Sequence, residues 1–314
     1  MPELPEVTTT VKGLQKVLPG LVFVDAWTDL AKKNQNIKQF KDTIKNEKFF
    51  KELKKKIIGE KVLFVERRAK NILIHTSNNH TILIHLKMTG HLLFGEYEKK
   101  IIRNKKLIIN KWTPKNQGPL NDPYNRFIHV VFTFSNNKHL AFCDSRKFGK
   151  VTIISTKEIK TSSHLKDIGP EPLDKSFIFK KFKERLFLKP NWKIKTTLMN
   201  QSLIAGIGNI YSDEMLWLSD INPESKPIKI PEKTLLKLYG AMKEVLLKGI
   251  NFGGDSMSDY RNIDGLPGNF QNHHNVYKKK NEKCVKNKCN GVIIRKVING
   301  RSAHFCNIHQ KLYD

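Results

Sequence analysis

The chain begins MPELPEV, which places a proline at position 2 and carboxylates at Glu3 and Glu6. If a methionine aminopeptidase removes Met1, Pro2 carries a free secondary amine. A terminal amine has a pKa near ~8 against ~10.4 for lysine, so roughly 250-fold more of it is neutral at pH 7. Such a nitrogen attacks an electrophilic carbon to give an iminium, and Glu3 is placed to move protons beside it. The alternative is an ordinary helix start, where Pro and Glu are both favoured.

A second group of reactive side chains lies near the C-terminus, where Cys284, Cys289, Cys306 and His309 are separated by four, sixteen and two residues. Thiolates and imidazole are ligands that Zn²⁺ prefers, and four of them leave no position open, so the spacing predicts one structural zinc ion. A tail of about 30 residues cannot bury its own core, so metal binding would supply its folding energy. The alternative is three scattered buried cysteines and a surface histidine.

Between the two pairs of ligands, the segment VINGRSAHF predicts two strands joined by an Asn-Gly turn. Arg301 would lie at the tip of this hairpin, where a guanidinium can reach a phosphate. Without further context, a solvated surface arginine is the favoured explanation of this residue.

The charge of the chain is strongly positive. Lys and Arg number 57 against 29 Asp and Glu, which gives a net charge of +28 and a pI near 9.9. A polyanion is the natural partner, and nucleic acid is favoured over an anionic membrane surface or a genome rich in lysine codons. The sequence lacks a signal peptide and an apolar run of about 18 residues, so we expect a cytoplasmic protein with no membrane partner.

Hydrophobic spacing predicts an α+β fold. Residues 5–18 have the period of a helix, and residues 61–155 contain many short apolar runs with turn signals between them. Short strands without intervening helices favour an antiparallel β-sandwich. Residues 97–126 interrupt these strands with a basic segment rich in Pro and Asn, which we interpret as an inserted surface loop.

The second half of the chain has helical spacing. We expect a catalytic sandwich domain over 1–155, a linker over 156–175, a helical domain over 176–275 and a zinc finger over 276–314. Within the helical domain, NIYSDEMLWLSD and the stripe behind Pro231 predict two helices, with Asn209 as the cap of the first. A loop rich in Gly, Asp and Ser follows them.

Taken together, these features resemble the formamidopyrimidine-DNA glycosylase (Fpg/MutM) branch of the Fpg/Nei family. The resemblance covers nearly the whole chain and rests on seven segments in the family's order. They are MPELPEV at 1, RRAKNILI at 67, HLKMTGHL at 85, DSRKFGK at 144, IGPEPL at 168, GIGNIYSDEML at 206 and GRSAHFC at 300. The resemblance implies an N-terminal β-sandwich with a flanking helix, a helix-two-turn-helix domain and a C-terminal zinc-finger hairpin.

The resemblance also implies a role for each matching residue. Pro2 is the nucleophile, Glu3 the acid and base, Lys70 a contact to the lesion or a nearby phosphate, and Glu6 a supporting carboxylate. The remaining residues contact DNA directly: His85, Lys147, Asn209 and Arg301 bind its backbone, and Met88, Arg146 and Phe148 fill the space that an extruded base leaves.

The activity implied is that of a monomeric, bifunctional glycosylase and AP lyase. Its partner would be duplex DNA containing oxidised purines or abasic sites, and binding should weaken with salt. An endonuclease VIII-like preference for oxidised pyrimidines and a non-catalytic DNA-binding protein are the alternatives. The chain departs from the family in the four-residue gap after Cys284, in His309 where a cysteine is usual, in Lys87 where glycine is commoner, and in the 97–126 insertion.

Overall fold

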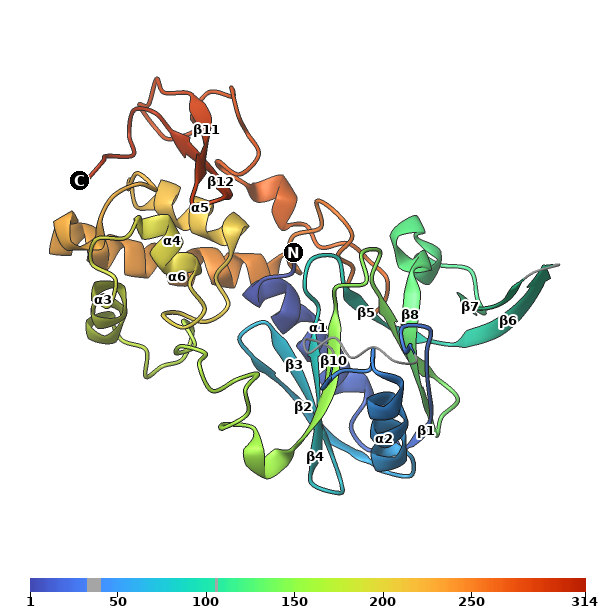
Figure 1. Ribbon diagram of the computed structural model, residues 1–314. Coiled ribbons are helices and arrows are strands. Elements are labelled where there is room, and N and C mark those ends of the chain that lie inside the picture. The colour runs from blue at the N-terminus through green and yellow to red at the C-terminus, as the bar shows by residue number, and fades with distance from the viewer. Residues whose placement is uncertain (33–40, 105–106) are drawn as a thin grey trace. The chain divides into compact units, whose positions relative to one another are not determined.

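The computed structural model describes residues 1–32, 41–104 and 107–314, and it describes no side chains within 101–110. The chain forms two compact units (Figure 1). The first contains residues 1–166 and 253–269, and the second contains residues 167–252 and 270–314. The loop of residues 253–269 therefore packs with the N-terminal unit, although it follows the last long helix in the chain. The change from the first unit to the second falls inside the expected linker.

Helix α1 (Leu4–Val17) opens the first unit and confirms the helix predicted over 5–18. Glu3 is the N-cap residue, Pro5 lies in the first turn, and the Glu6 carboxylate accepts a hydrogen bond from the backbone N–H of Glu3 in a capping box. Val7, Leu14 and their neighbours at helical spacing are buried against the first-unit core. Burial of this apolar stripe, more than helix propensity, fixes the position of the chain's N-terminus.

The predicted antiparallel β-sandwich is confirmed by two four-stranded sheets. In hydrogen-bonded order, one consists of β1 (Phe23–Thr28), β8 (Ile128–Phe134), β9 (His139–Cys143) and β5 (His91–Gly95). The other consists of β10 (Lys150–Ser155), β4 (His80–His85), β3 (Asn71–Thr76) and β2 (Val62–Arg68). The core between them contains Ile72, Ile84, Leu92, Phe132 and Phe142, all at most 1% exposed. Both sheets thus hide one face from water, which favours the short apolar runs seen in the sequence.

Strand β1 and helix α2 (Glu47–Ile57) were not predicted. Strand β1 contains polar residues and pairs with β8, and helix α2 lies in a lysine-rich stretch of the sequence. The lysines of α2 lie on a helix that buries Leu53 and Ile57 in the core, and Asn46 caps it by accepting from the N–H of Phe49 at 3.1 Å. The many lysines therefore obscured the apolar spacing that would have predicted this amphipathic helix.

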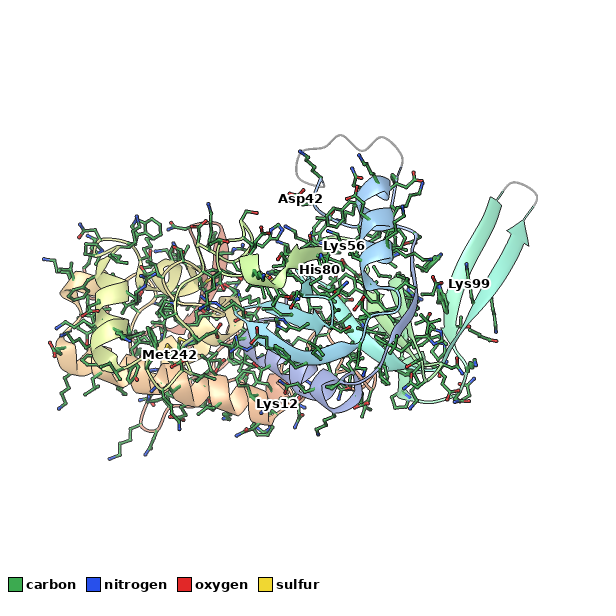
Figure 2. The ribbon with its side chains drawn as sticks, turned by 90° about the horizontal axis from the view of Figure 1, so that it is seen from below. Lys12, Asp42, Lys56, His80, Lys99 and Met242 are labelled. Carbon is green, nitrogen blue, oxygen red and sulfur yellow. The ribbon has the colours of Figure 1, made fainter. Side chains whose placement is uncertain are left out.

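The interpretation of residues 97–126 as a surface loop is wrong for its first part. Residues Tyr97–Asn104 (β6) and Leu107–Pro114 (β7) pair with each other as a separate two-stranded sheet. Figure 2 shows this hairpin extending away from the sandwich, with Lys99 on its first strand. At its base, Tyr97 and Trp112 join an apolar cluster with Leu93 and Val131 on β5 and β8. The short 3-10 helices Pro119–Asn121 and Pro123–Arg126 complete the insertion.

The second unit is mainly helical. Its helices are α3 (Phe179–Phe187), α4 (Ile194–Met199), α5 (Asn209–Leu218) and α6 (Glu232–Asn251), followed by strands β11 (Ile293–Ile298) and β12 (Arg301–Cys306). Helices α5 and α6 and the β11–β12 hairpin all correspond to predicted elements. No helix in the described part of the chain is long and apolar enough to cross a membrane.

Two buried carboxylates of α5 hold the hairpin end of this unit. Asp213 forms an ion pair of 2.5 Å with the buried Lys195 ammonium and accepts the backbone N–H of His304 at 3.0 Å. Glu214 accepts the backbone N–H groups of residues 275, 276 and 277 at 2.9 to 3.0 Å. The helical layer and the C-terminal tail are therefore joined by charge-assisted hydrogen bonds as well as by the apolar cluster that Trp217 of α5 forms with Val276 and Ile293.

We expect Ile263→Ala to destabilise the first unit by about 2–5 kcal/mol, the usual cost of truncating a buried isoleucine. Ile263 is 4% exposed within the sandwich core, and Gly13 of α1 lies so close that an added Cβ would meet the Ile263 side chain at 2.8 Å. Met257 is on the same loop but 41% exposed, so Met257→Ala should change the stability by less than about 0.5 kcal/mol. Urea unfolding of both variants measures the difference, and equal stabilities would contradict the placement of this loop.

Candidate active site and nucleic-acid interface

The Glu6 carboxylate organises the N-terminal end of the chain. Glu6 is 1% exposed, and its two oxygens accept from the backbone N–H groups of Glu3 and Asp255, each at 2.7 Å. The Tyr260 hydroxyl donates to the backbone carbonyl of Glu6 at 3.0 Å. Gly254 has φ +88°, and a Cβ there would lie 2.9 Å from the Glu6 side chain, so only glycine fits. The loop of residues 253–269 is thus bound directly to the start of α1.

Pro2 and Glu3 lie at this same point, and both are buried, whereas Met1 is 37% exposed. The structure contains Met1, so the nitrogen of Pro2 is here part of a peptide bond. Removal of the exposed Met1 would convert that nitrogen into an amine next to a buried carboxylate. Glu3 is 1% exposed, so its side chain lies in the same buried surroundings as that of Glu6.

Basic residues gather around His85 on the β10–β4–β3 part of the second sheet. His85 is directly opposite Asn71 on one side and Lys150 on the other, and the buried Lys70 precedes Asn71. Burial, followed by the charges of Lys87, Lys70 and Lys150, lowers the pKa of His85 to about 3. The imidazole is therefore neutral near pH 7. Its Nδ1 accepts from the Lys87 N–H at 2.9 Å, which leaves Nε2 to carry the proton as a donor.

Asp144 joins two turns that carry candidate DNA-inserting residues. Its Oδ1 accepts from the Thr89 hydroxyl at 2.5 Å and from the Arg146 N–H at 3.3 Å, and its Oδ2 accepts from the Gly149 N–H at 2.6 Å. Asp144 is 1% exposed, so these bonds are shielded from water. Met88 precedes Thr89, and the carboxylate therefore fixes the turn of Met88 against the turn of Arg146.

The side chains presented by the second turn are open to solvent. Phe148 is 51% exposed, and the Arg146 guanidinium lies 4.5 Å from the centre of its ring. Lys147 is also exposed, has a positive φ of 58°, and its carbonyl accepts from the Lys45 ammonium at 2.7 Å. A large exposed aromatic ring on a rigid turn is available to insert between bases.

The predicted role of Asn209 as a helix cap is wrong. Gly208 is the N-cap of α5, and Asn209 is its first helical residue. Its amide donates weakly to the Ser302 hydroxyl at 3.5 Å, next to Arg301 on the hairpin. The structure therefore places Asn209 against the strand that begins at Arg301, through tertiary packing rather than through a capping motif.

The four predicted metal ligands converge at the base of the β11–β12 hairpin. Their ligand atoms all lie within 4.8 Å of one another. The Cys289 sulfur is 3.6 Å from the Cys306 sulfur and from Nδ1 of His309, and the Cys284 sulfur is 3.4 Å from the same nitrogen. Tetrahedral ligands with Zn–S bonds of about 2.3 Å lie roughly 3.5–3.8 Å apart, so these residues fit a metal ion of that geometry.

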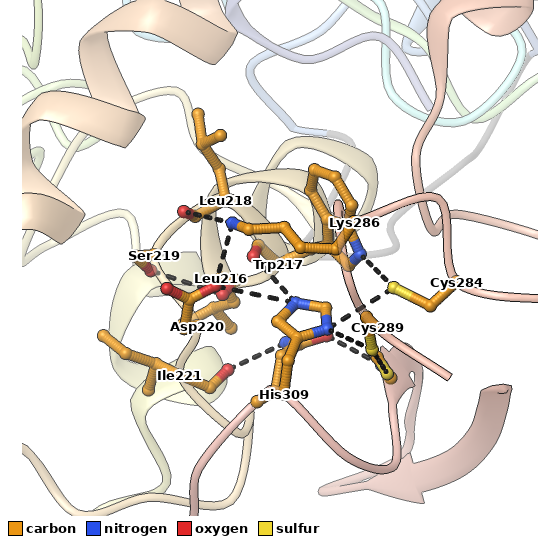
Figure 3. A network of polar contacts seen from close by, with 12 residues as sticks. Leu216, Trp217, Leu218, Ser219, Asp220, Ile221, Cys284, Lys286, Cys289 and His309 are labelled. Atoms are coloured by element: carbon orange, nitrogen blue, oxygen red, sulfur yellow. Dashed lines mark hydrogen bonds and ion pairs between the residues drawn. The ribbon is translucent and has the colours of Figure 1, made fainter. Parts of the chain in front are cut away.

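The surroundings orient these ligands (Figure 3). The Trp217 indole N–H points to the Cys284 sulfur at 3.4 Å, and Nε2 of His309 lies 3.3 Å from the Trp217 carbonyl, where it can donate. That bond leaves Nδ1 as the nitrogen that faces the sulfurs of Cys284 and Cys289. A Cβ on Gly291 would lie 2.3 Å from the Cys306 sulfur, so the cluster needs glycine there. Sequence reasoning predicted the cluster of three cysteines and one histidine but not these supporting residues.

The arrangement of a glycosylase-type N-terminal domain and a helix-two-turn-helix domain defines a class of DNA glycosylases. Residues 1–151 match the formamidopyrimidine-DNA glycosylase N-terminal domain, and residues 168–261 match the formamidopyrimidine-DNA glycosylase H2TH domain. The chain belongs to the formamidopyrimidine-DNA glycosylase family.

Individual relatives agree with this family membership. The formamidopyrimidine-DNA glycosylase of Pelotomaculum thermopropionicum is 32% identical over 314 residues, which cover 99% of this chain and all of the relative. The Lactococcus lactis Fpg in complex with DNA containing an abasic site has a TM-score of 0.79 at 30% identity, covering 98% of this chain and 99% of that one. A MutM in complex with DNA containing carbocyclic 8-oxo-G has a TM-score of 0.78 at 30% identity, covering 99% and 100%.

We expect Asp144→Ala to lower the free energy of unfolding by about 1–3 kcal/mol, because it leaves the buried N–H of Gly149 without its acceptor. The two turns should also exchange their amide hydrogens faster. Ser145→Ala, one residue away and half-buried, serves as the control and should change the stability by less than about 0.5 kcal/mol. Urea unfolding measures the stability of both variants, and hydrogen exchange measures the opening of the two turns. An Asp144→Ala variant as stable as Ser145→Ala would contradict the proposed joining of the two turns by Asp144.

Proposed function

We propose that this protein is a base-excision-repair DNA glycosylase with AP-lyase activity, which removes oxidised purines such as 8-oxoguanine and formamidopyrimidines from duplex DNA. The observation that carries this function is the match to the formamidopyrimidine-DNA glycosylase family over both of its domains. The buried carboxylates around the N-terminus and the cationic surroundings of His85 support it. The solved structures of Fpg and MutM described above hold DNA with an abasic site and with carbocyclic 8-oxo-G, which agree with the substrates proposed here.

In this mechanism, Pro2 is the nucleophile after Met1 has been removed. Its neutral amine attacks C1′ of the damaged nucleotide, the bond from C1′ to the base breaks, and the base leaves with the bonding electrons and a proton. Glu3 protonates the ring oxygen so that the sugar opens and the amine becomes an iminium. Loss of a C2′ proton then expels the 3′-phosphate, and a second elimination expels the 5′-phosphate. The Glu6 carboxylate keeps Glu3 in place by accepting a hydrogen bond from the backbone N–H of Glu3.

The remaining residues bind and distort the DNA. Lys70 and His85 are assigned to the lesion and its adjoining phosphates, and the neutral Nε2–H of His85 suits a phosphate oxygen without adding to the local positive charge. Lys147, Asn209 and Arg301 are assigned to the backbone. Met88, Arg146 and Phe148 occupy the space left by the extruded nucleotide; one of them, Arg146, would bond the orphaned cytosine.

Zn²⁺ is the metal that suits three thiolates and one imidazole, and we assign one structural ion to Cys284, Cys289, Cys306 and His309. The ion would supply folding energy to the hairpin and thereby hold Arg301 in place. A cytoplasmic location is part of the same proposal.

Borohydride trapping tests the catalytic assignment. The wild-type chain should form a covalent complex with a duplex containing 8-oxoguanine opposite cytosine, and intact mass should show that Met1 is absent. Pro2→Gly keeps a primary terminal amine and should reduce the trapped complex, because its nitrogen is less well positioned. Glu3→Gln should abolish base excision while DNA binding remains within about threefold of the wild type.

Three results would contradict the assignment. They are a retained Met1 in an active preparation, an undiminished trapped complex in Pro2→Gly, and faster excision from a thymine glycol duplex than from the 8-oxoguanine duplex. The last result would favour an endonuclease VIII-like activity.

Metal analysis tests the zinc assignment. We expect one zinc per wild-type chain, loss of the ion in Cys306→Ser, and retention of it in His309→Cys, because thiolate and imidazole are both good zinc ligands. Cys143 is buried in the first unit, so Cys143→Ser is the control that should keep its zinc. Full zinc content in Cys306→Ser would exclude this ligand set.

A further inference from the structure

A hollow of about 250 Å³ lies in the second unit between the region of α4 and the tip of the β11–β12 hairpin. It is lined by Trp192, Lys195, Thr196, Met199, Asn200, Ile298, Asn299 and Arg301. Only Arg301 among these has a part in the proposed function. The volume is slightly below the range of roughly 300–1,000 Å³ that small-molecule pockets occupy, so it suits one planar group and not a base pair.

The apolar part of the hollow includes an exposed indole. Trp192 is 41% exposed, although tryptophan carries a large apolar ring that proteins usually bury, and Ile298 beside it is 2% exposed. The Lys189 ammonium lies 4.8 Å from the centre of the Trp192 ring. An exposed aromatic ring with cations beside it is the arrangement on which single nucleic-acid bases stack.

The polar part of the hollow is fixed by the protein's own hydrogen bonds. Asn299 has a positive φ of 46° in the hairpin turn, and its amide donates to the Thr196 hydroxyl at 3.0 Å. This bond joins the hairpin tip to α4 and keeps the hollow in shape. The Lys195 ammonium is already paired with Asp213 at 2.5 Å, so the exposed Arg301 is the cation available to an anionic ligand.

We propose that this hollow binds one unstacked nucleotide of a DNA strand. Its base stacks on Trp192, the amides of Asn200 and Asn299 meet the edge of the base, and Arg301 binds its phosphate. A free phosphate would leave the indole without a stacking partner, and an apolar ligand would leave the guanidinium without an anion. The combination therefore favours a base linked to a phosphate. That the strand is DNA rests on the proposed function.

The proposal is tested with the full chain and a five-nucleotide thymidine strand that contains no lesion. Binding should quench tryptophan fluorescence, and Trp192→Ala should weaken binding about tenfold, the effect of removing one base-stacking ring. Trp192→Phe should restore most of the affinity without the fluorescence change. Leu188, four residues away and 57% exposed, provides the control, and Leu188→Ala should bind as the wild type does.

The source of the ligand and the state of the protein are distinguished in the same series. Thymidine monophosphate should bind at least tenfold more weakly than the strand, and equal affinities would overturn the assignment to a strand. Unchanged strand binding by Trp192→Ala would overturn the site itself. Borohydride trapping on a blunt 8-oxoguanine duplex should be the same for Trp192→Ala and the wild type, so a failure of the proposed glycosylase activity would be recognised separately.

Discussion

The first unit depends on one buried carboxylate, that of Glu6, which accepts the backbone N–H of Glu3 and that of Asp255, a residue 249 positions after Glu6 in the chain. A carboxylate in this position is expensive to bury, and its two charge-assisted hydrogen bonds offset that cost. One bond fixes the N-terminal residues at the start of α1, and the other fixes the loop of residues 253–269. The chemistry assigned to Pro2 and Glu3 needs both, because a terminus that frays cannot hold a nucleophile at one place.

Buried carboxylates that accept backbone N–H groups also hold other segments of the chain in place. Asp144 accepts three hydrogen bonds between the turns of Met88 and Arg146, and Asp213 and Glu214 accept backbone N–H groups from the C-terminal tail. In a chain with a net charge of +28, these few acids are used internally and leave the lysines on the surface. The surface thus keeps the positive charge that attracts a polyanion, while the buried carboxylates hold segments of the chain together.

Sequence patterns predicted the elements whose formation depends on neighbouring residues in the chain. Apart from β1, the strands of the sandwich follow from apolar spacing and turn residues, as do α1, α5, α6 and the Asn-Gly hairpin, and the spacing of cysteine and histidine predicted the cluster that the structure brings together. Strand β1 was missed because only Phe23 and Ala26 of its six residues are buried, and helix α2 was missed because its polar residues outnumber its apolar ones. The β6–β7 hairpin escaped because its strands pair only with each other. The contacts of Asp255 and Asn209 are tertiary, and no spacing in the sequence contains them.

The return of residues 253–269 to the first unit sets an order of events during synthesis. Ile263 and the N–H of Asp255 reach the sandwich only after the α-helices α3 to α6 of the second unit have been made. Removal of Met1, by contrast, can take place while the nascent chain is still short. The proline amine would then be exposed early in synthesis, and the buried surroundings of that amine would form late. The geometry around the amine would thus form only once residues 253–269 have been synthesised, long after the first residues have emerged from the ribosome.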